Sequence, residues 1–108
     1  MPAYYLFDNV EVIDPDGLAR YAQAVAPLVA AYGGRYLAVA ADPEMVEGSP
    51  GLTSVVLIEF PDLAAARNWY ASAEYQPLKA LRHRSARNNA VLFAGTDLSK
   101  AAPADNLG

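Results

Sequence analysis

Apolar and polar residues follow two different periodicities along the chain, and these predict four strands and three helical stretches. Strands are expected over residues 4–13, 35–41, 54–60 and 90–95, where β-branched and aromatic residues cluster. Apolar residues spaced three and four apart predict a helix over residues 15–32. Two shorter helices are expected over residues 63–72 and from about residue 77 to residue 89.

Capping residues predict where the first helix begins and ends. Asp14 stands where a helix N-cap is expected, and Pro15 follows at the first helical position, where a missing N–H costs nothing. The pair Gly33 and Gly34 predicts the end, since glycine adopts the left-handed C′ conformation without penalty. Pro27 interrupts the apolar stripe, so a kink or a break is expected near Ala26.

The order of these elements predicts an α+β fold of the ferredoxin-like βαββαβ kind. Such a fold has a four-stranded antiparallel sheet with helices on one face. Both sides of the expected strands are apolar, and one helical layer covers only one of them. We therefore expect a homodimer in which a second copy of the sheet buries the other side.

Length, charge and cysteine content narrow the class of protein. The 108 residues predict one domain over residues 1–96 and a tail over residues 97–108, mobile or packed on a partner subunit. A net charge of −4 argues against binding nucleic acid. With no signal-peptide pattern and no apolar run long enough to span a membrane, we expect a cytoplasmic protein. The lack of cysteine excludes disulfides and cysteine nucleophiles but is compatible with any redox compartment.

Several stretches resemble one family of small proteins. They include Asp14-Pro15, the run YGGRYL at residues 32–37, Ile58-Glu59-Phe60, and the run EYQPLKALR at residues 74–82. On these residues the chain resembles the domain-of-unknown-function family 1330, within the dimeric α+β barrel superfamily. The resemblance implies the fold and a dimer. It implies no activity, because proteins of this shape include cofactor-free monooxygenases, isomerases, cyclases and haem-dependent enzymes.

Arg35 and Glu59 are charged residues inside the expected second and third strands. Arg35 begins the second strand and Glu59 nearly ends the third, so an antiparallel pairing brings them together. By alternation Arg35 is expected to share a face with Leu37 and Val39. Two interpretations are open: a structural salt bridge, or a catalytic pair in which Arg35 binds an acidic substrate and Glu59 is the general base.

Two further charged residues are candidate ligand contacts. Asp8, on the first strand, is expected to place a second carboxylate near Glu59. Arg82 belongs to a cluster of positive residues that the helix dipole alone accounts for, but its place beside Leu78 and Leu81 could turn it inward toward an anionic ligand. His83, the only histidine, is expected at the surface, and no metal site is predicted around it.

Aromatic residues complete the set of candidates. Tyr36, Trp69 and Tyr75 are candidate ligand-binding residues, although aromatics of this kind more often belong to cores and interfaces. No dinucleotide, phosphate-loop or catalytic-triad motif is present, so no cofactor is expected. Haem would require His83 to point inward.

The leading hypothesis is a mainly apolar cavity between the sheet and the helices. Arg35, Glu59, Tyr75 and Arg82 are expected to project into it and to act on a small organic acid or aromatic by proton transfer or isomerisation. The alternatives are a non-catalytic module that binds a small ligand and a purely structural dimer. The loop over residues 42–53 has no motif that assigns it a role.

Overall fold

The computed structural model describes residues 1–48 and 51–96 and contains four strands and three helices within them. In chain order these are β1 (Ala3–Val12), α1 (Pro15–Ala31), β2 (Arg35–Ala41), β3 (Val55–Phe60), α2 (Leu63–Ala71), α3 (Tyr75–Ser85) and β4 (Ala86–Ala94). The tail predicted over residues 97–108 lies outside the described residues.

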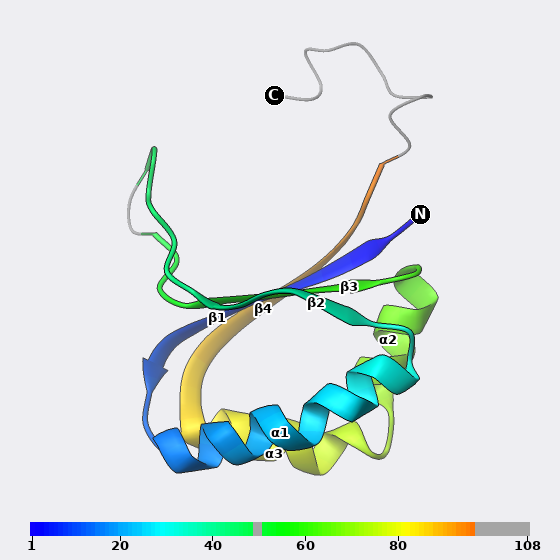
Figure 1. Ribbon diagram of the computed structural model, residues 1–108, viewed down its shortest axis with the longest axis horizontal. Helices are drawn as coiled ribbons and strands as arrows, with labels where there is room; N and C mark the ends of the chain where they lie inside the picture. The colour runs from blue at the N-terminus through cyan, green and yellow to red at the C-terminus, as the bar shows by residue number, and fades with distance from the viewer. Residues whose placement is uncertain (49–50, 97–108) are drawn as a thin grey trace.

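The strands form one antiparallel sheet, and the helices cover one of its faces. The strand order is β2-β3-β1-β4, so β2 and β4 are the edges and β1 is central. In Figure 1 the sheet forms the upper layer, and α1 and α3 form the lower layer. This arrangement confirms the predicted α+β, ferredoxin-like fold.

Local chemistry accounts for the bounds of α1. The Asp14 carboxylate accepts a hydrogen bond from the Gly17 backbone N–H at 3.1 Å, which caps the first turn. Gly33 follows the helix with φ of +82°, the conformation that glycine adopts most easily. The helix was expected to kink or break near Ala26, and the break does not occur, because α1 continues to Ala31. Pro27 and Gln23 are exposed, so water can bond the Gln23 carbonyl that Pro27 leaves free.

β4 begins four residues earlier than the sequence predicts. The residues Ala86 to Asn89 were expected to end the last helix, but they form the first part of the strand. They pair with the second half of β1, where Asn88 lies opposite Asn9 and Arg87 opposite Glu11. These polar residues carry no strand signal of their own, so the pairing with β1 decides their conformation.

The core lies between the sheet and the helices and is rich in aromatic rings. Trp69, Tyr75 and Phe60 are fully buried there, and Trp69 lies 4.3 Å from Tyr75 between ring centroids. Tyr5 and Phe7 of β1 meet the same cluster from the sheet. This dense packing holds α2 and α3 at fixed positions on the sheet.

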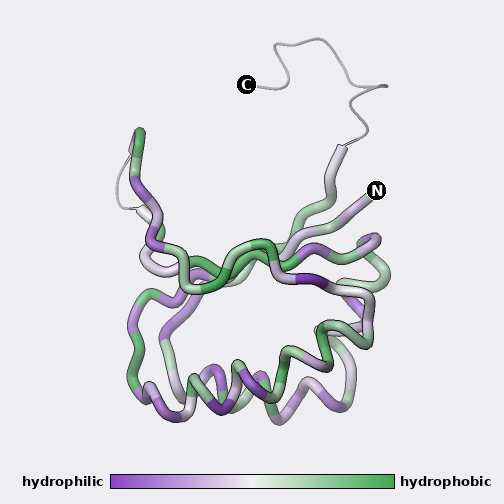
Figure 2. The backbone as a smooth tube through the Cα atoms, viewed as in Figure 1, coloured by the Kyte–Doolittle hydropathy of each residue, from purple (hydrophilic) through white to green (hydrophobic). Residues whose placement is uncertain are grey.

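The other face of the sheet is uncovered and mainly apolar. Register places Phe93 opposite Tyr4 and Val91 opposite Leu6 on this face, and the side chains of Phe93 and Val91 are about half exposed. We call this surface the open face. The loop between β2 and β3 rises from the sheet on this side, away from the helices (Figure 1). The residues at the tip of this loop are hydrophobic (Figure 2).

Candidate functional site

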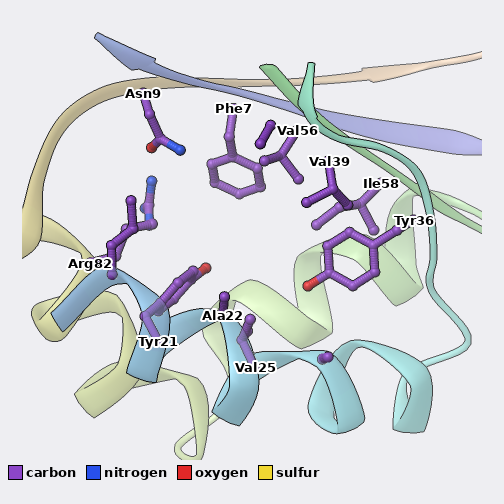
Figure 3. A pocket seen from close by; sticks show the side chains of 13 residues that line it. Phe7, Asn9, Tyr21, Ala22, Val25, Tyr36, Val39, Val56, Ile58 and Arg82 are labelled. Atoms are coloured by element: carbon purple, nitrogen blue, oxygen red, sulfur yellow. The ribbon is translucent and has the colours of Figure 1, made fainter. Parts of the chain in front are cut away.

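A pocket of about 390 Å³ lies between the helix-covered face of the sheet and the helices. It is at the small end of the range of about 300–1,000 Å³ that is usual for ligand sites. Its helical wall comes from Leu18, Tyr21, Ala22 and Val25 of α1 and from Arg82 of α3. Its sheet wall comes from Phe7, Val56, Ile58, Tyr36 and Val39, and Figure 3 shows these side chains converging.

The residues that line the pocket differ in exposure from one end to the other, and we take the exposed end as its mouth and the buried end as its closed end. Arg82 stands at the closed end, beneath the central strand β1, and is only 3% exposed. Val39 stands at the mouth, on the edge strand β2, and is 64% exposed. Ala22 and Ala26 of α1 also line the pocket and are exposed, so small side chains keep this side open.

Four neighbours fix the position of the Arg82 guanidinium. Nη1 donates a hydrogen bond to Asn88 Oδ1 at 3.1 Å, and Nη2 lies 3.4 Å from the Tyr70 hydroxyl and 3.3 Å from His83 Nε2. The guanidinium carbon lies 4.7 Å from the centre of the Phe7 ring, in a cation–π contact. These contacts hold the guanidinium in one position, and Arg82 also lines the pocket.

Arg82 has no acidic counter-ion in the part of the chain that the structure describes. The salt bridges found there join Arg35 to Glu59 and Arg87 to Glu11. The Arg82 Nε–H is buried and has no hydrogen-bond partner. Buried charges are ordinarily paired, because removing a charge from water is costly.

The positive charge of Arg82 affects the pKa of its neighbour His83. Burial, together with the charges of Arg82 and Lys79, lowers the pKa of His83 below its usual value. A neutral His83 can accept a hydrogen bond from Arg82, whereas a charged imidazolium would repel it. His83 is exposed, as predicted, and does not point into the pocket.

Asn9 of β1 and several tyrosine hydroxyls provide the other polar groups around the pocket. The hydroxyls of Tyr21 and Tyr75 are hydrogen-bonded at 2.9 Å, and Tyr21 lines the pocket. Burial raises the pKa of Tyr21 and of Tyr75, and it raises the pKa of Tyr36 to about 12. All three are therefore neutral near pH 7 and can donate a hydrogen bond to a ligand or to each other.

Two irregularities in β2 shape the mouth. The register with β3 shifts between Tyr36 and Ala38 and again between Ala38 and Ala41, and Ala40 has φ of +49°. The first shift turns Val39 to the pocket side of the sheet. The prediction that Arg35 and Val39 share a face is therefore wrong, because an inserted residue reverses the alternation.

Arg35 and Glu59 do pair, but not in the pocket. Arg35 Nε donates to Glu59 Oε1 at 2.7 Å, and the side chains are 71% and 21% exposed. Register puts the pair on the open face, whereas the neighbouring Tyr36 and Ile58 face the helices. The expectation that Arg35 and Glu59 project into the cavity is wrong, because the sheet separates them from it.

The remaining predicted residues lie in three places. Tyr36 lines the pocket, whereas Trp69 and Tyr75 belong to the buried core behind it. Asp8 is on the open face, where its carboxylate accepts hydrogen bonds from the Thr53 and Ser54 backbone at 2.8 and 3.0 Å. It is opposite Val55, four residues from the position opposite Glu59, so the expected pair of carboxylates does not form.

Sequence reasoning missed Tyr21 and Asn88 as parts of the site. Tyr21 stands in the apolar stripe of α1, between Leu18 and Val25, and that position did predict that it faces the sheet. Asn88 contacts Arg82 only because β4 starts early. No sequence signal points to that contact.

The described residues contain neither a metal-binding cluster nor a membrane-spanning helix. No three histidine, cysteine or acidic side chains within residues 1–48 and 51–96 are grouped so that they could hold a metal ion. In that same part of the chain, no helix has both the length and the apolar character needed to cross a membrane.

Solved structures with this fold cover most of the chain. A protein of unknown function from Rhodopseudomonas palustris has 17% identity and a TM-score of 0.66, with 89% of this chain and 83% of that chain covered. A dimeric ferredoxin-like protein of unknown function from Thermobifida fusca has 14% identity and a TM-score of 0.59, with coverages of 88% and 92%. SnoaB, a cofactor-independent oxygenase from Streptomyces nogalater, has 15% identity and a TM-score of 0.55, with coverages of 89% and 92%.

At these identities the structures show a shared fold only. The sequence matches none of the curated proteins. A family model does match nearly the whole described chain, over residues 2–96, and it is the model of a domain of unknown function. The protein therefore belongs to the family DUF1330.

Proposed function

We propose that the protein binds a small, mainly apolar organic acid in the pocket between sheet and helices, with Arg82 as the anchor for the carboxylate. The observation that carries this proposal is the buried guanidinium without an acidic partner. A ligand carboxylate would supply the missing counter-charge. It would also accept the hydrogen bond that the Arg82 Nε–H now lacks.

The rest of the pocket suits the body of such a ligand. Its walls are the aromatic ring of Phe7 and the aliphatic side chains of Val25, Val56 and Ile58. Burying an apolar body against them is favourable, and the rigid core behind them means that little has to be ordered on binding. The pocket therefore offers an apolar acid both a positive charge for its carboxylate and an apolar surface for its body.

Thermal-shift measurements with a panel of aromatic and aliphatic monocarboxylates test the proposal. Each acid is paired with its primary amide, which has the same shape but no charge. Acids should raise the melting temperature of the wild type, of Arg35→Ala and of Arg84→Met, and should not raise that of Arg82→Met. Arg84 is the matched control, because it lies on the same helix and is exposed. Equal shifts in Arg82→Met and the wild type, or equal shifts by acids and amides, would contradict the proposal.

A second candidate function is proton transfer or isomerisation of the bound acid without a cofactor. Two observations favour it: the Tyr21 hydroxyl lines the pocket within the Tyr21–Tyr75 pair, and SnoaB shows that this fold supports chemistry without a cofactor. A neutral tyrosine near a carboxylate can stabilise an enolate oxygen by hydrogen bonding. Arg35 and Glu59 remain a separate catalytic proposal, which would place the reaction on the open face.

Deuterium exchange distinguishes catalysis from binding alone. The bound acid is incubated in D₂O, and loss of its α-proton signal is followed by NMR. Catalysis at the pocket predicts exchange that Tyr21→Phe abolishes and Glu59→Gln leaves unchanged. Loss of exchange in Glu59→Gln alone would instead move the chemistry to the open face, and no exchange in the wild type would leave a binding protein.

We also propose that the protein is a homodimer through the open face. Support comes from the apolar side chains of Leu57, Val91 and Phe93 on that face, and from the loop that rises beside it with Met45 and Val46 exposed. A contiguous apolar surface of this kind usually marks an interface. A second copy of the same surface can cover it symmetrically. The Thermobifida fusca protein of the same fold is dimeric.

A further inference from the structure

We infer that the pocket recognises its ligand at two points, so that the preferred acid carries a second polar group, a hydroxyl or a carbonyl, at the end opposite its carboxylate. The second point is the hydroxyl of Tyr36. This inference rests on the proposed function, because it takes Arg82 as the first point.

Tyr36 is placed to face a ligand and not the protein. It belongs to the edge strand β2, and Figure 3 shows its hydroxyl directed into the pocket on the side away from Arg82. Within the described residues this hydroxyl has no hydrogen-bond partner, in contrast to Tyr21 and Tyr75, which bond to each other. The raised pKa of Tyr36 keeps it a neutral donor and acceptor well above pH 7.

Most of the lining between the two polar points is apolar. Phe7, Val56 and Ile58 form the sheet side of the pocket there, and Val25 forms the helix side. The Tyr21 hydroxyl also lines the pocket, but it is already hydrogen-bonded to Tyr75 at 2.9 Å. A polar group in the middle of the ligand would have to compete with that bond or lose its water without gaining a partner. Polar groups at the two ends would each be satisfied.

The position of the mouth sets the order of entry. The mouth lies at the outer end of the pocket, between Val39 of β2 and Ala26 of α1, and Arg82 lies at the inner end. A ligand entering there reaches Arg82 with its leading end, and its trailing end stops near Tyr36. The carboxylate is therefore the leading group, and the second polar group trails.

The chemical class that fits is an aryl or alkyl carboxylate with a terminal hydroxyl or oxo group. A neutral hydrogen bond to Tyr36 should improve affinity by about 3- to 10-fold over the same acid without that group. The gain is modest beside that from Arg82, because hydrogen bonds to a charged group are roughly twice as strong.

Isothermal titration calorimetry with three matched pairs of probes tests the inference. The parents are benzoate, phenylacetate and 3-phenylpropionate, and each is compared with its para-hydroxy derivative, so that the length of the ligand is scanned. The proteins are the wild type, Tyr36→Phe, Arg82→Met and Tyr32→Phe. Tyr32 is the matched control, because it is a partly buried tyrosine near β2 that does not line the pocket.

In at least one pair, the hydroxylated acid should bind the wild type and Tyr32→Phe about 3- to 10-fold more tightly than its parent. Tyr36→Phe should bind both members of that pair equally, at the affinity of the parent. If no pair shows a hydroxyl advantage, or if Tyr36→Phe keeps it, the inference is overturned while Arg82-dependent binding of the parents still stands. Two results would overturn the proposed function, and the inference with it. In one, the parent acids bind Arg82→Met as tightly as they bind the wild type. In the other, the parent acids bind neither of these two proteins.

Discussion

The two faces of the sheet each carry an arginine, and the protein holds the two in opposite ways. On the open face, Arg35 is largely exposed and paired with Glu59 at 2.7 Å. On the helix-covered face, Arg82 is buried, contacts neutral groups only, and lines a pocket. One charge is neutralised in water, and the other is left uncompensated in a low-dielectric site.

We propose that this difference separates a charge with no ligand role from a charge that binds a ligand. An exposed ion pair contributes little to stability, typically about 0–1 kcal/mol, and can be lost at small cost. A buried charge without a partner opposes folding and persists where it has another use. The pairing of a charge, more than its place in an apolar strand, therefore distinguishes the two arginines.

The largest expected effect is on the open face. Val91→Asp should convert the proposed dimer to a monomer, since it places a carboxylate beside Leu6 on the apolar open face, where dimerisation would bury it. Sedimentation equilibrium should show the dissociation constant rising by about 100-fold or more. Ala24→Asp, on the exposed side of α1, should leave the mass unchanged. A monomeric wild type, or a dimeric Val91→Asp, would remove the open face as the interface.

The next largest effect is on the free energy of unfolding of variants at the two arginines. Without ligand, Arg82→Met should leave the free energy of unfolding unchanged or raise it by about 1–2 kcal/mol, because an unpaired buried charge is replaced by an apolar chain of similar length. Arg35→Met should change it by less than about 1 kcal/mol. Urea denaturation measures both. A loss of more than about 2 kcal/mol in Arg82→Met would show that Arg82 is mainly structural.

A smaller effect is expected at the tyrosine pair. Tyr75→Phe removes the hydrogen bond to Tyr21 and should lower the free energy of unfolding by about 1 kcal/mol. Tyr32→Phe is the control, because Tyr32 packs against the same core and its hydroxyl has no hydrogen bond within the described part of the chain. It should change the free energy of unfolding by less than half as much. Equal losses in the two variants, measured by urea denaturation, would show that the pair makes no special contribution to the helix-covered face.

The smallest expected effect is the pH dependence of the stability that the Arg35–Glu59 pair contributes. The hydrogen bond from Arg35 lowers the pKa of Glu59 in the folded protein. Stability from this pair is therefore present above the unfolded pKa, about 4.3, and is lost as the pH falls through the lowered folded value. Glu59→Gln should reduce the urea midpoint slightly at pH 6 and leave it unchanged at pH 2. Glu44→Gln, on the exposed loop, should show no such dependence.

Much of the fold could be predicted because local signals agree with the tertiary contacts. Residues 35–41 form a strand as expected, and Asp14 caps the first helix as expected. The early start of β4 could not be predicted, since Asn88 and Asn89 favour turns and are held in a strand only by pairing with β1. The break that was an alternative at Ala26 does not occur, since the exposed surface of α1 tolerates the hydrogen bond that Pro27 removes.

The candidate site could be predicted only in part. The place of Arg82 beside Leu78 and Leu81 allowed its side chain to turn inward, and the structure shows it buried. The sequence could not tell which face of the sheet carries Arg35, because strands with two apolar sides have no distinguishable inner side. The shift in β2 that turns Val39 into the pocket has no sequence signal either.

Two-dimensional ¹⁵N NMR of the arginine Nε–H groups tests the central claim most directly, because it reports which guanidinium meets a bound acid. On titration with phenylacetate, the Nε–H signal of Arg82 should shift strongly toward the position of a hydrogen-bonded group, and that of Arg35 should stay in place. A titration in which the Arg35 signal moves and the Arg82 signal does not would contradict the account.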